Sequence, residues 1–189
     1  MTEESDACAV AHGAAPAVTA GPAPAAAPAA PRGTGPDGDR TLIAVFAGPV
    51  SGYLLRYAAD AGYRTLLVEP DAARADAAKM AGFPVLAAVP EDVEGADVVV
   101  TDHHRDELGV ALRDALAAKA RWVGIMGNPR HAGPHVAALE SLGVAPGEIA
   151  RVHRPVGLNI GSRTPPEIAL STLAGLIADR NSRPGGFSF

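Results

Sequence analysis

Cysteine is almost absent from this sequence, since Cys8 is the single one among 189 residues. A lone thiol cannot close an internal disulfide, so we expect the fold to be stabilised by packing alone and the chain to suit a reducing compartment, the cytoplasm. Aromatic residues are also scarce, at 4% of the chain, although 48% is hydrophobic. The core is therefore expected to consist mainly of small aliphatic side chains.

Long hydrophobic runs and an excess of positive charge are lacking as well. No segment approaches the roughly 18 apolar residues that a membrane-spanning helix needs, and the acidic residues 1–6 are not followed by the unbroken apolar stretch of a signal peptide. The formal net charge of −5 offers no broad basic surface for a phosphate backbone. We therefore expect a soluble protein whose partners include neither membrane nor nucleic acid.

The chain divides into three parts by composition. Residues 1–40 are rich in Ala, Pro and Gly, and repeated prolines prevent a long helix, so we expect a disordered tail. Residues 41–183 carry the regular hydrophobic patterns of one folded domain, which a chain of this length accommodates. Residues 184–189 form a short tail.

Within 41–183, short apolar runs alternate with longer segments of helical period. The predicted strands are 42–47, 65–68, 84–88, 96–101 and 121–126, and the predicted helices pass through 54–61, 71–81, 105–119, 130–142 and 165–180. Such alternation is typical of βαβ units. It predicts an α/β fold with a Rossmann-like, mostly parallel sheet and helices on both faces.

The turn after the first predicted strand is the first candidate site. Gly48 and Pro49 lie where a dinucleotide fold places G-x-G-x-x-G, but Phe46 takes the position of the first glycine. The start of the following helix would still offer N–H groups to an anion. The alternative is a Rossmann-shaped turn that binds nothing.

Glu69 follows the second predicted strand, about 21 residues after Gly48. At this spacing an acidic side chain can accept hydrogen bonds from the ribose hydroxyls of a dinucleotide. An acidic residue at the end of a strand is also a common solvated turn residue, so both interpretations stay open.

A dense polar cluster follows the fourth predicted strand, at the sheet edge where open α/β folds bind ligands. Its members are Thr101, Asp102, His103, His104, Arg105 and Asp106. The adjacent imidazoles could ligate a metal, or one could act as a general base or contact a polar ligand. The remaining interpretation is helix capping by Asp102 with solvated histidines. We assign no metal, because the spacing shows no third ligand.

The junction after the fifth predicted strand contains Gly127, Asn128 and Arg130, with the arginine in the first turn of the next predicted helix. Such a junction could receive an anion. Further on, residues 151–168 are glycine-punctuated and include Arg163. Thr164 and Glu167 have the spacing of a capping box, which accounts for those two residues alone.

The sequence at 155–161, PVGLNIG, followed by TPPEIA at 164–169, is similar to the P-I-G-L-D-I-G and T-P-E-E-I-A segments of the xanthine dehydrogenase accessory (XdhC/CoxI) proteins. Residues 122–128, WVGIMGN, resemble the family's Y-I-G-x-L-G-S segment, and 101–106 its T-H-D-H region. These segments occur in the same order as in the family. Residues 41–183 therefore resemble the family's C-terminal Rossmann domain.

The resemblance implies an accessory, chaperone-like role in maturing a molybdenum hydroxylase, such as xanthine or carbon monoxide dehydrogenase. It implies binding of molybdenum cofactor, an anionic pterin phosphate that also occurs as a dinucleotide, and delivery to the apoenzyme. A cofactor-binding accessory protein is favoured over a catalyst. The family's N-terminal domain would come from a separate chain, and the resemblance suggests a homodimer.

The cofactor-binding residues expected on these grounds are Gly48, Pro49, Glu69, Thr101, Asp102, His103, His104, Gly127, Asn128, Arg130 and Arg163. Two other functions fit part of the pattern. An NAD(P)-dependent oxidoreductase would use Gly48 and Glu69, whereas a ligand-free interaction module would fill its crevice with Phe46 and other side chains.

Overall fold

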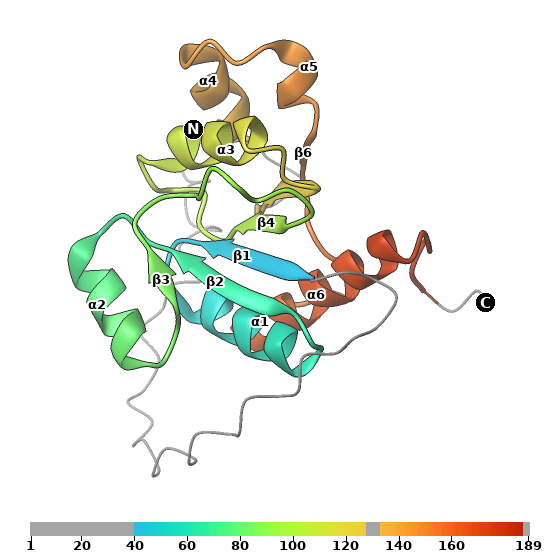
Figure 1. The fold of residues 1–189 in the computed structure, drawn as a ribbon. Helices are drawn as coiled ribbons and strands as arrows, with labels where there is room; N and C mark the ends of the chain where they lie inside the picture. The colour runs from blue at the N-terminus through green and yellow to red at the C-terminus, as the bar shows by residue number, and fades with distance from the viewer. Residues whose placement is uncertain (1–39, 128–132, 187–189) are drawn as a thin grey trace, which may run out of the picture. The chain divides into compact units, whose positions relative to one another are not determined.

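The computed structural model describes residues 40–127 and 133–186. They form one six-stranded parallel sheet in the order β3-β2-β1-β4-β5-β6 (Figure 1). The strands are β1 (Thr41–Val45), β2 (Arg64–Val68), β3 (Val85–Leu86), β4 (Asp97–Val100), β5 (Trp122–Ile125) and β6 (Val152–His153). This is the strand order of a doubly wound dinucleotide-binding fold, and its switch point lies between β1 and β4. The predicted fold class is confirmed.

Helices cover both faces of the sheet, as Figure 1 shows for α1 and α6 on one side and α3 and α4 on the other. The helices are α1 (Pro49–Asp60), α2 (Ala72–Met80), α3 (Leu108–Ala117), α4 (Pro134–Ser141), α5 (Pro146–Ile149) and α6 (Pro165–Arg180). No helix of the described residues is both long and apolar enough to cross a membrane.

The central strands are buried on both faces, which explains why they are continuous apolar runs rather than alternating ones. In β1, Leu42 packs with Leu54 of α1 and Leu173 of α6. The next residue, Ile43, packs on the opposite face with Leu112 of α3. The two sides of one short strand thus anchor both helical layers.

The described structure differs from the predicted elements at two helix starts and at one connection. Helix α3 starts at Leu108 instead of 105, because Arg105 is held outside the helix by Glu69 and Glu107. The predicted helix 130–142 starts at Pro134, after an extended Gly133. Helix α5 and strand β6 had not been predicted, since four-residue and two-residue elements are too short to show a period. The predictions for residues 1–39, 128–132 and 187–189 lie outside the described residues.

Candidate functional site at the carboxyl edge

The turn from β1 to α1 keeps the geometry of a glycine turn although Phe46 occupies it. Phe46 has φ of 74°, a left-handed conformation that glycine adopts readily, and its N–H donates to the Val68 carbonyl at 2.8 Å. Its side chain is 1% exposed and belongs to the core on the α3 side. The phenyl ring is therefore accommodated in the core, which offsets the strain of the turn.

The first two N–H groups after Phe46 already have acceptors within the protein. Ala47 donates to Glu69 Oε2 at 2.7 Å, and Gly48, the N-cap of α1, donates to Ser51 Oγ at 2.8 Å. Pro49, the first residue of α1, has no N–H to give. The turn therefore offers an anion fewer free donors than the sequence suggested.

Glu69 is fully buried, and its carboxylate holds the turn in place. Oε1 accepts from the Asp71 N–H at 2.9 Å and from Arg105 Nη2 at 3.0 Å. The Arg105 guanidinium also lies over the Phe46 ring, 4.8 Å from its centroid. A ribose could reach this carboxylate only if Arg105 moved.

The loop after β4 joins the two strands at the switch point. Thr101 Oγ1 lies 2.9 Å from the carbonyl oxygens of both Val45 and Phe46, to which its single O–H donates. Asp102 accepts the backbone N–H of His104 at 2.9 Å, and the rings of His103 and His104 lie 4.0 Å apart. Within residues 40–127 and 133–186, no three His, Cys, Asp or Glu side chains are grouped to hold a metal ion.

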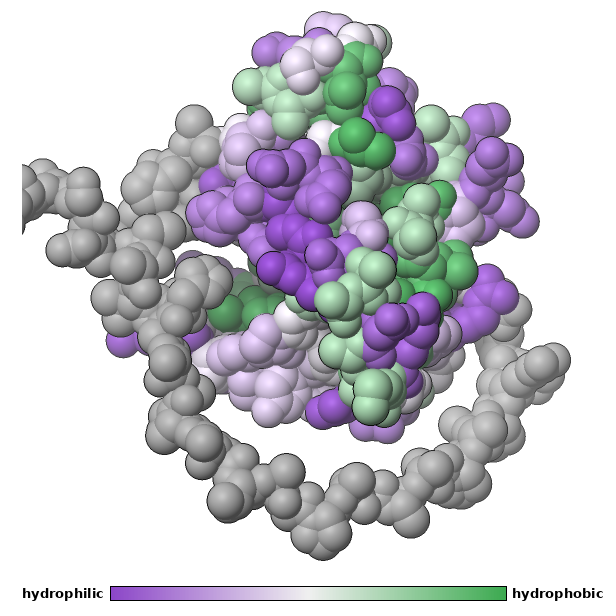
Figure 2. Space-filling model, turned by 90° about the vertical axis from the view of Figure 1, so that its left-hand side faces the viewer, coloured by the Kyte–Doolittle hydropathy of each residue, from purple (hydrophilic) through white to green (hydrophobic). Residues whose placement is uncertain are grey.

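Figure 2 views the molecule from the end where the strands finish, and hydrophilic surface gathers near the middle of that end. The polar residues that follow β4 and the glycine that follows β5 come to this same edge, because all six strands are parallel. The structure thus brings Gly48, Thr101 and Gly127 to one edge, whereas Asn128 and Arg130 lie outside the described residues.

The segment after β6 leads back to the start of α6. Gly157 has φ of 86° and lies so close to α6 that a Cβ would be 2.9 Å from the Thr172 nitrogen. Glu167 accepts the backbone N–H groups of Arg163 and Thr164 at 2.9 and 3.0 Å, so the predicted capping box forms. Close packing explains Gly157, and the exposed Arg163 side chain remains a candidate ligand contact.

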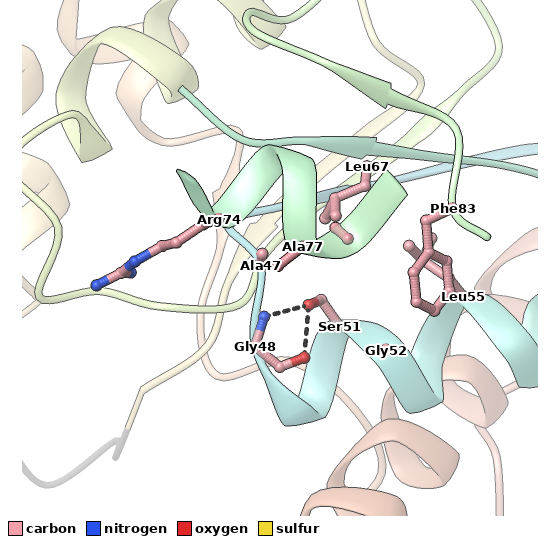
Figure 3. A pocket seen from close by; sticks show the side chains of 10 residues that line it. Ala47, Gly48, Ser51, Gly52, Leu55, Leu67, Arg74, Ala77 and Phe83 are labelled. Carbon is pink, nitrogen blue, oxygen red and sulfur yellow. Dashed lines mark hydrogen bonds between the residues drawn. The ribbon is translucent and has the colours of Figure 1, made fainter. Parts of the chain in front are cut away.

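A cavity of about 280 Å³ lies beside the β1–α1 turn, between α1 and α2 (Figure 3). Gly48 and Ser51 line one end, and Leu55 and Phe83 the other. Ligand pockets usually have volumes of about 300 to 1,000 Å³, so this apolar cavity suits a single ring rather than a whole dinucleotide. A larger cavity of about 570 Å³ lies at the opposite, amino edge, beside the helix-free connection between β3 and β4.

The amino edge of the sheet contains an ion-pair cluster that the sequence did not reveal. Asp97, at the start of β4, is fully buried and pairs with Arg121 at 2.6 Å and Arg180 at 2.7 Å. Arg121 also pairs with Asp179 at 2.6 Å. Burial raises the pKa of Asp97, although both guanidiniums oppose this. The cluster joins β4, the residue before β5, and α6, and it lies at the edge opposite the candidate site.

Strand order, switch point and polar carboxyl edge together define a doubly wound α/β domain of the Rossmann class. The family described as XdhC Rossmann domain matches residues 42–176. The chain belongs to this family.

Individual proteins are also similar to this chain. YqeB of Escherichia coli (strain K12), an uncharacterized protein, is 37% identical over 89 residues, which make up 47% of this chain and 16% of YqeB. A crystal structure from Bacillus halodurans, described as a xanthine dehydrogenase, has a TM-score of 0.61 at 22% identity. The match covers 76% of this chain and 45% of the Bacillus halodurans chain. This chain therefore spans less than half of the length of YqeB and of the Bacillus halodurans protein.

Proposed function

We propose that this chain is an accessory protein for a molybdenum hydroxylase of the xanthine or carbon monoxide dehydrogenase type. It would bind molybdenum cofactor or its dinucleotide form at the carboxyl edge and pass it to the apoenzyme. The observation that supports this most is the match of residues 42–176 to the XdhC Rossmann domain, together with the polar residues at the switch point.

The chemistry of the carboxyl edge suits an anionic pterin phosphate. Asp102, His103 and His104 offer hydrogen-bond donors and acceptors for a pterin, and Gly127 marks the adjacent β5 junction. Arg163 would supply positive charge from the segment before α6. Asn128 and Arg130 are proposed as cofactor contacts from the sequence alone, because they lie outside the described residues. The bound cofactor would supply the redox chemistry, which takes place in the hydroxylase, and these residues would bind and orient it.

The engaged donors of the first turn support this proposal over an NAD(P)-dependent oxidoreductase. A dinucleotide fold uses those N–H groups for pyrophosphate. Here Ala47 and Gly48 donate to Glu69 and Ser51, and Glu69 is covered by Arg105. The usual pyrophosphate and ribose contacts would require these bonds to break.

Calorimetric titration of the full chain tests the proposal, with molybdenum cofactor, its dinucleotide forms and NAD(P) as separate ligands. We expect molybdenum cofactor to bind and to do so at least about tenfold more weakly in His104→Ala, a loss of about 1.4 kcal/mol. Arg113→Gln, which changes an exposed arginine paired with Asp114 on α3, is the matched control. Binding of NAD(P) alone would favour the oxidoreductase, and binding of none of these ligands would favour the interaction module.

Delivery is tested separately by adding the loaded protein to cofactor-free hydroxylase. The expected result is a gain of hydroxylase activity that the His104→Ala protein supplies less well. Equal activation by free cofactor and by the loaded protein would argue against delivery.

A homodimer remains a prediction. Helix α6 is a candidate interface, because Leu170 is 54% exposed, although Ala169, Leu173 and Leu176 of the same helix pack in the core against α1. Size-exclusion chromatography with light scattering would determine the oligomeric state.

A further inference from the structure

Two glycines after β5 leave space for the side chains of an arginine and a histidine. A Cβ on Gly127 would lie 2.8 Å from Arg154 Nε, and a Cβ on Gly133 would lie 2.4 Å from His135 Nδ1 and 3.1 Å from Arg154 Cδ. Gly133 has φ of −77°, an ordinary value for any residue. A side chain at position 133 would therefore displace His135 or Arg154 from where they lie.

His135 is a buried polar residue whose bonding is incomplete. Its side chain is 8% exposed, and Nδ1 has no hydrogen-bond partner among the residues that the structure describes. Burial, with a smaller contribution from the charge of Arg154, lowers the pKa of His135. Leaving a buried polar atom unpaired destabilises the folded chain, so such an atom calls for an explanation.

The ring of His135 lies at the start of α4, a helix whose N-cap residue makes no side-chain hydrogen bond. Gly133, the N-cap of α4, has no side chain to accept a hydrogen bond, and Pro134 follows as the first helical residue. The N–H groups of His135 and Val136 belong to the first turn, where no carbonyl of the same helix can accept them. The positive end of the helix dipole adds to their attraction for an anion.

Arg154 brings a full positive charge to the same place. It follows β6 directly, and the pairing of Gly124 with His153 sets it beside the carboxyl end of β5. The guanidinium lies against Gly127, while its Cδ lies near Gly133 and the start of α4. Arg154 has further interactions, and its charge and position are what an anion would meet.

We propose that Arg154, His135 and the N-terminus of α4 form a binding subsite for a phosphate group. Phosphate oxygens accept from backbone N–H groups at a helix start, from guanidinium and from imidazole nitrogen, and all three kinds of donor converge here. The contrast with α1 supports this choice, because the N–H of the α1 N-cap donates to Ser51. The subsite is independent of the proposed function, since any phosphorylated small molecule of suitable shape could use it.

The subsite lies within reach of the switch point. Adjacent strands are about 4.8 Å apart, so the end of β5 lies about 10 Å from the end of β1. A ligand that contacts Thr101 at the switch point could therefore place its phosphate against Arg154 and His135.

Inorganic pyrophosphate is the probe for this subsite, titrated into the full chain by calorimetry and by NMR of the histidine rings. The chain has six histidines, and the ring signal missing from His135→Gln identifies His135. We expect pyrophosphate to shift that signal and to raise the pKa of His135, because a bound anion favours the charged imidazolium.

Arginine variants complete the test. We expect Arg154→Gln to weaken pyrophosphate binding at least tenfold and Arg154→Lys, which keeps the charge, to restore part of it. Arg151→Gln is the matched control, because Arg151 lies three residues away and pairs with Glu148. Absence of binding, a His135 signal that pyrophosphate leaves unmoved, or equal binding by Arg154→Gln and wild type would each overturn the proposal. Loss of molybdenum cofactor binding with pyrophosphate binding intact would count against the proposed function only.

Discussion

Asp97 and His135 are buried polar residues at opposite edges of the same sheet, and they differ in how their bonding is completed. Both carboxylate oxygens of Asp97 are held, by Arg121 and Arg180. His135 Nδ1 has no partner in the described part of the chain. At the amino edge, charge is used to hold strands and α6 together. At the carboxyl edge, we propose that His135 and the start of α4 bind a phosphate group.

The Glu69–Arg105 pair shows that the carboxyl edge is not uniform. In its β1–α1 part, internal hydrogen bonds engage the polar groups, as in the Asp97 cluster. In its β5–α4 part, the N-cap residue Gly133 makes no side-chain hydrogen bond to the helix. The amino edge and the first turn thus have polar groups that pair within the protein, whereas we propose that the β5–α4 junction binds a phosphate group.

The largest effect is expected at the amino edge. Asp97→Asn removes the carboxylate that two guanidiniums share, and breaking one partner of a buried ion pair lowers the free energy of unfolding by about 3 kcal/mol. Urea denaturation measures it. The control, Asp76→Asn, changes an exposed pair with Lys79 and should shift stability by less than about 1 kcal/mol. A small effect for Asp97→Asn would mean that the amino edge is not held by this cluster.

Glu69→Gln should have the next largest effect. The amide cannot accept from Ala47, Asp71 and Arg105 at once, so we expect a loss of about 2 kcal/mol in the free energy of unfolding. Glu107→Gln is the matched control, because the Glu107 side chain also pairs with Arg105 but is 40% exposed. Equal stability of the two variants would show that Glu69 does not fix the first turn.

Thr101→Val tests the join between β4 and the turn. Valine keeps the shape of threonine but loses the hydroxyl that donates to Val45 and Phe46, which should cost about 1 kcal/mol in thermal unfolding. Thr65→Val, in β2, is the matched control, since the Thr65 hydroxyl makes no hydrogen bond within residues 40–127 and 133–186. If both variants unfolded at the wild-type temperature, the hydroxyl would have no structural role, and ligand contact would remain as its function.

The smallest effect concerns pH and His135. Because burial lowers the pKa of His135 below the 6.5 of an unperturbed histidine, the unfolded chain takes up a proton first as pH falls. The free energy of unfolding should therefore be highest above pH of about 6.5. It should fall by less than about 1 kcal/mol between that pH and pH of about 5.5. This loss in the free energy of unfolding should be smaller in His135→Gln, which urea denaturation above pH of about 6.5 and at pH of about 5.5 would measure. Identical pH dependence in both proteins would contradict burial of a neutral imidazole.

Much of the fold could be predicted from the sequence because the central strands β1, β4 and β5 are fully buried. Continuous apolar runs such as 98–100, separated by helical periods, predict a parallel sheet without any knowledge of contacts. The capping box of Thr164 and Glu167 was also recognisable, since it depends on residues only three positions apart. The resemblance to the XdhC family was carried by local segments in the same way.

Long-range pairing could not be predicted. Asp97 and Arg180 are 83 residues apart, and Glu69 and Arg105 are 36 apart, so no local pattern links them. Strand β6 is two residues long and is defined by its partner β5 rather than by its own sequence. The role of Phe46 likewise depended on whether the core had room for its ring.

The sequence by itself determined the class of fold, the position of the polar residues at strand ends and the family, because burial, periodicity and motifs are local properties of the chain. The tertiary structure decided which of those polar residues are used internally and which distant residues meet. Glu69 is neutralised by Arg105, and Arg154 is brought to His135, only because parallel strands place distant segments at one edge of the sheet.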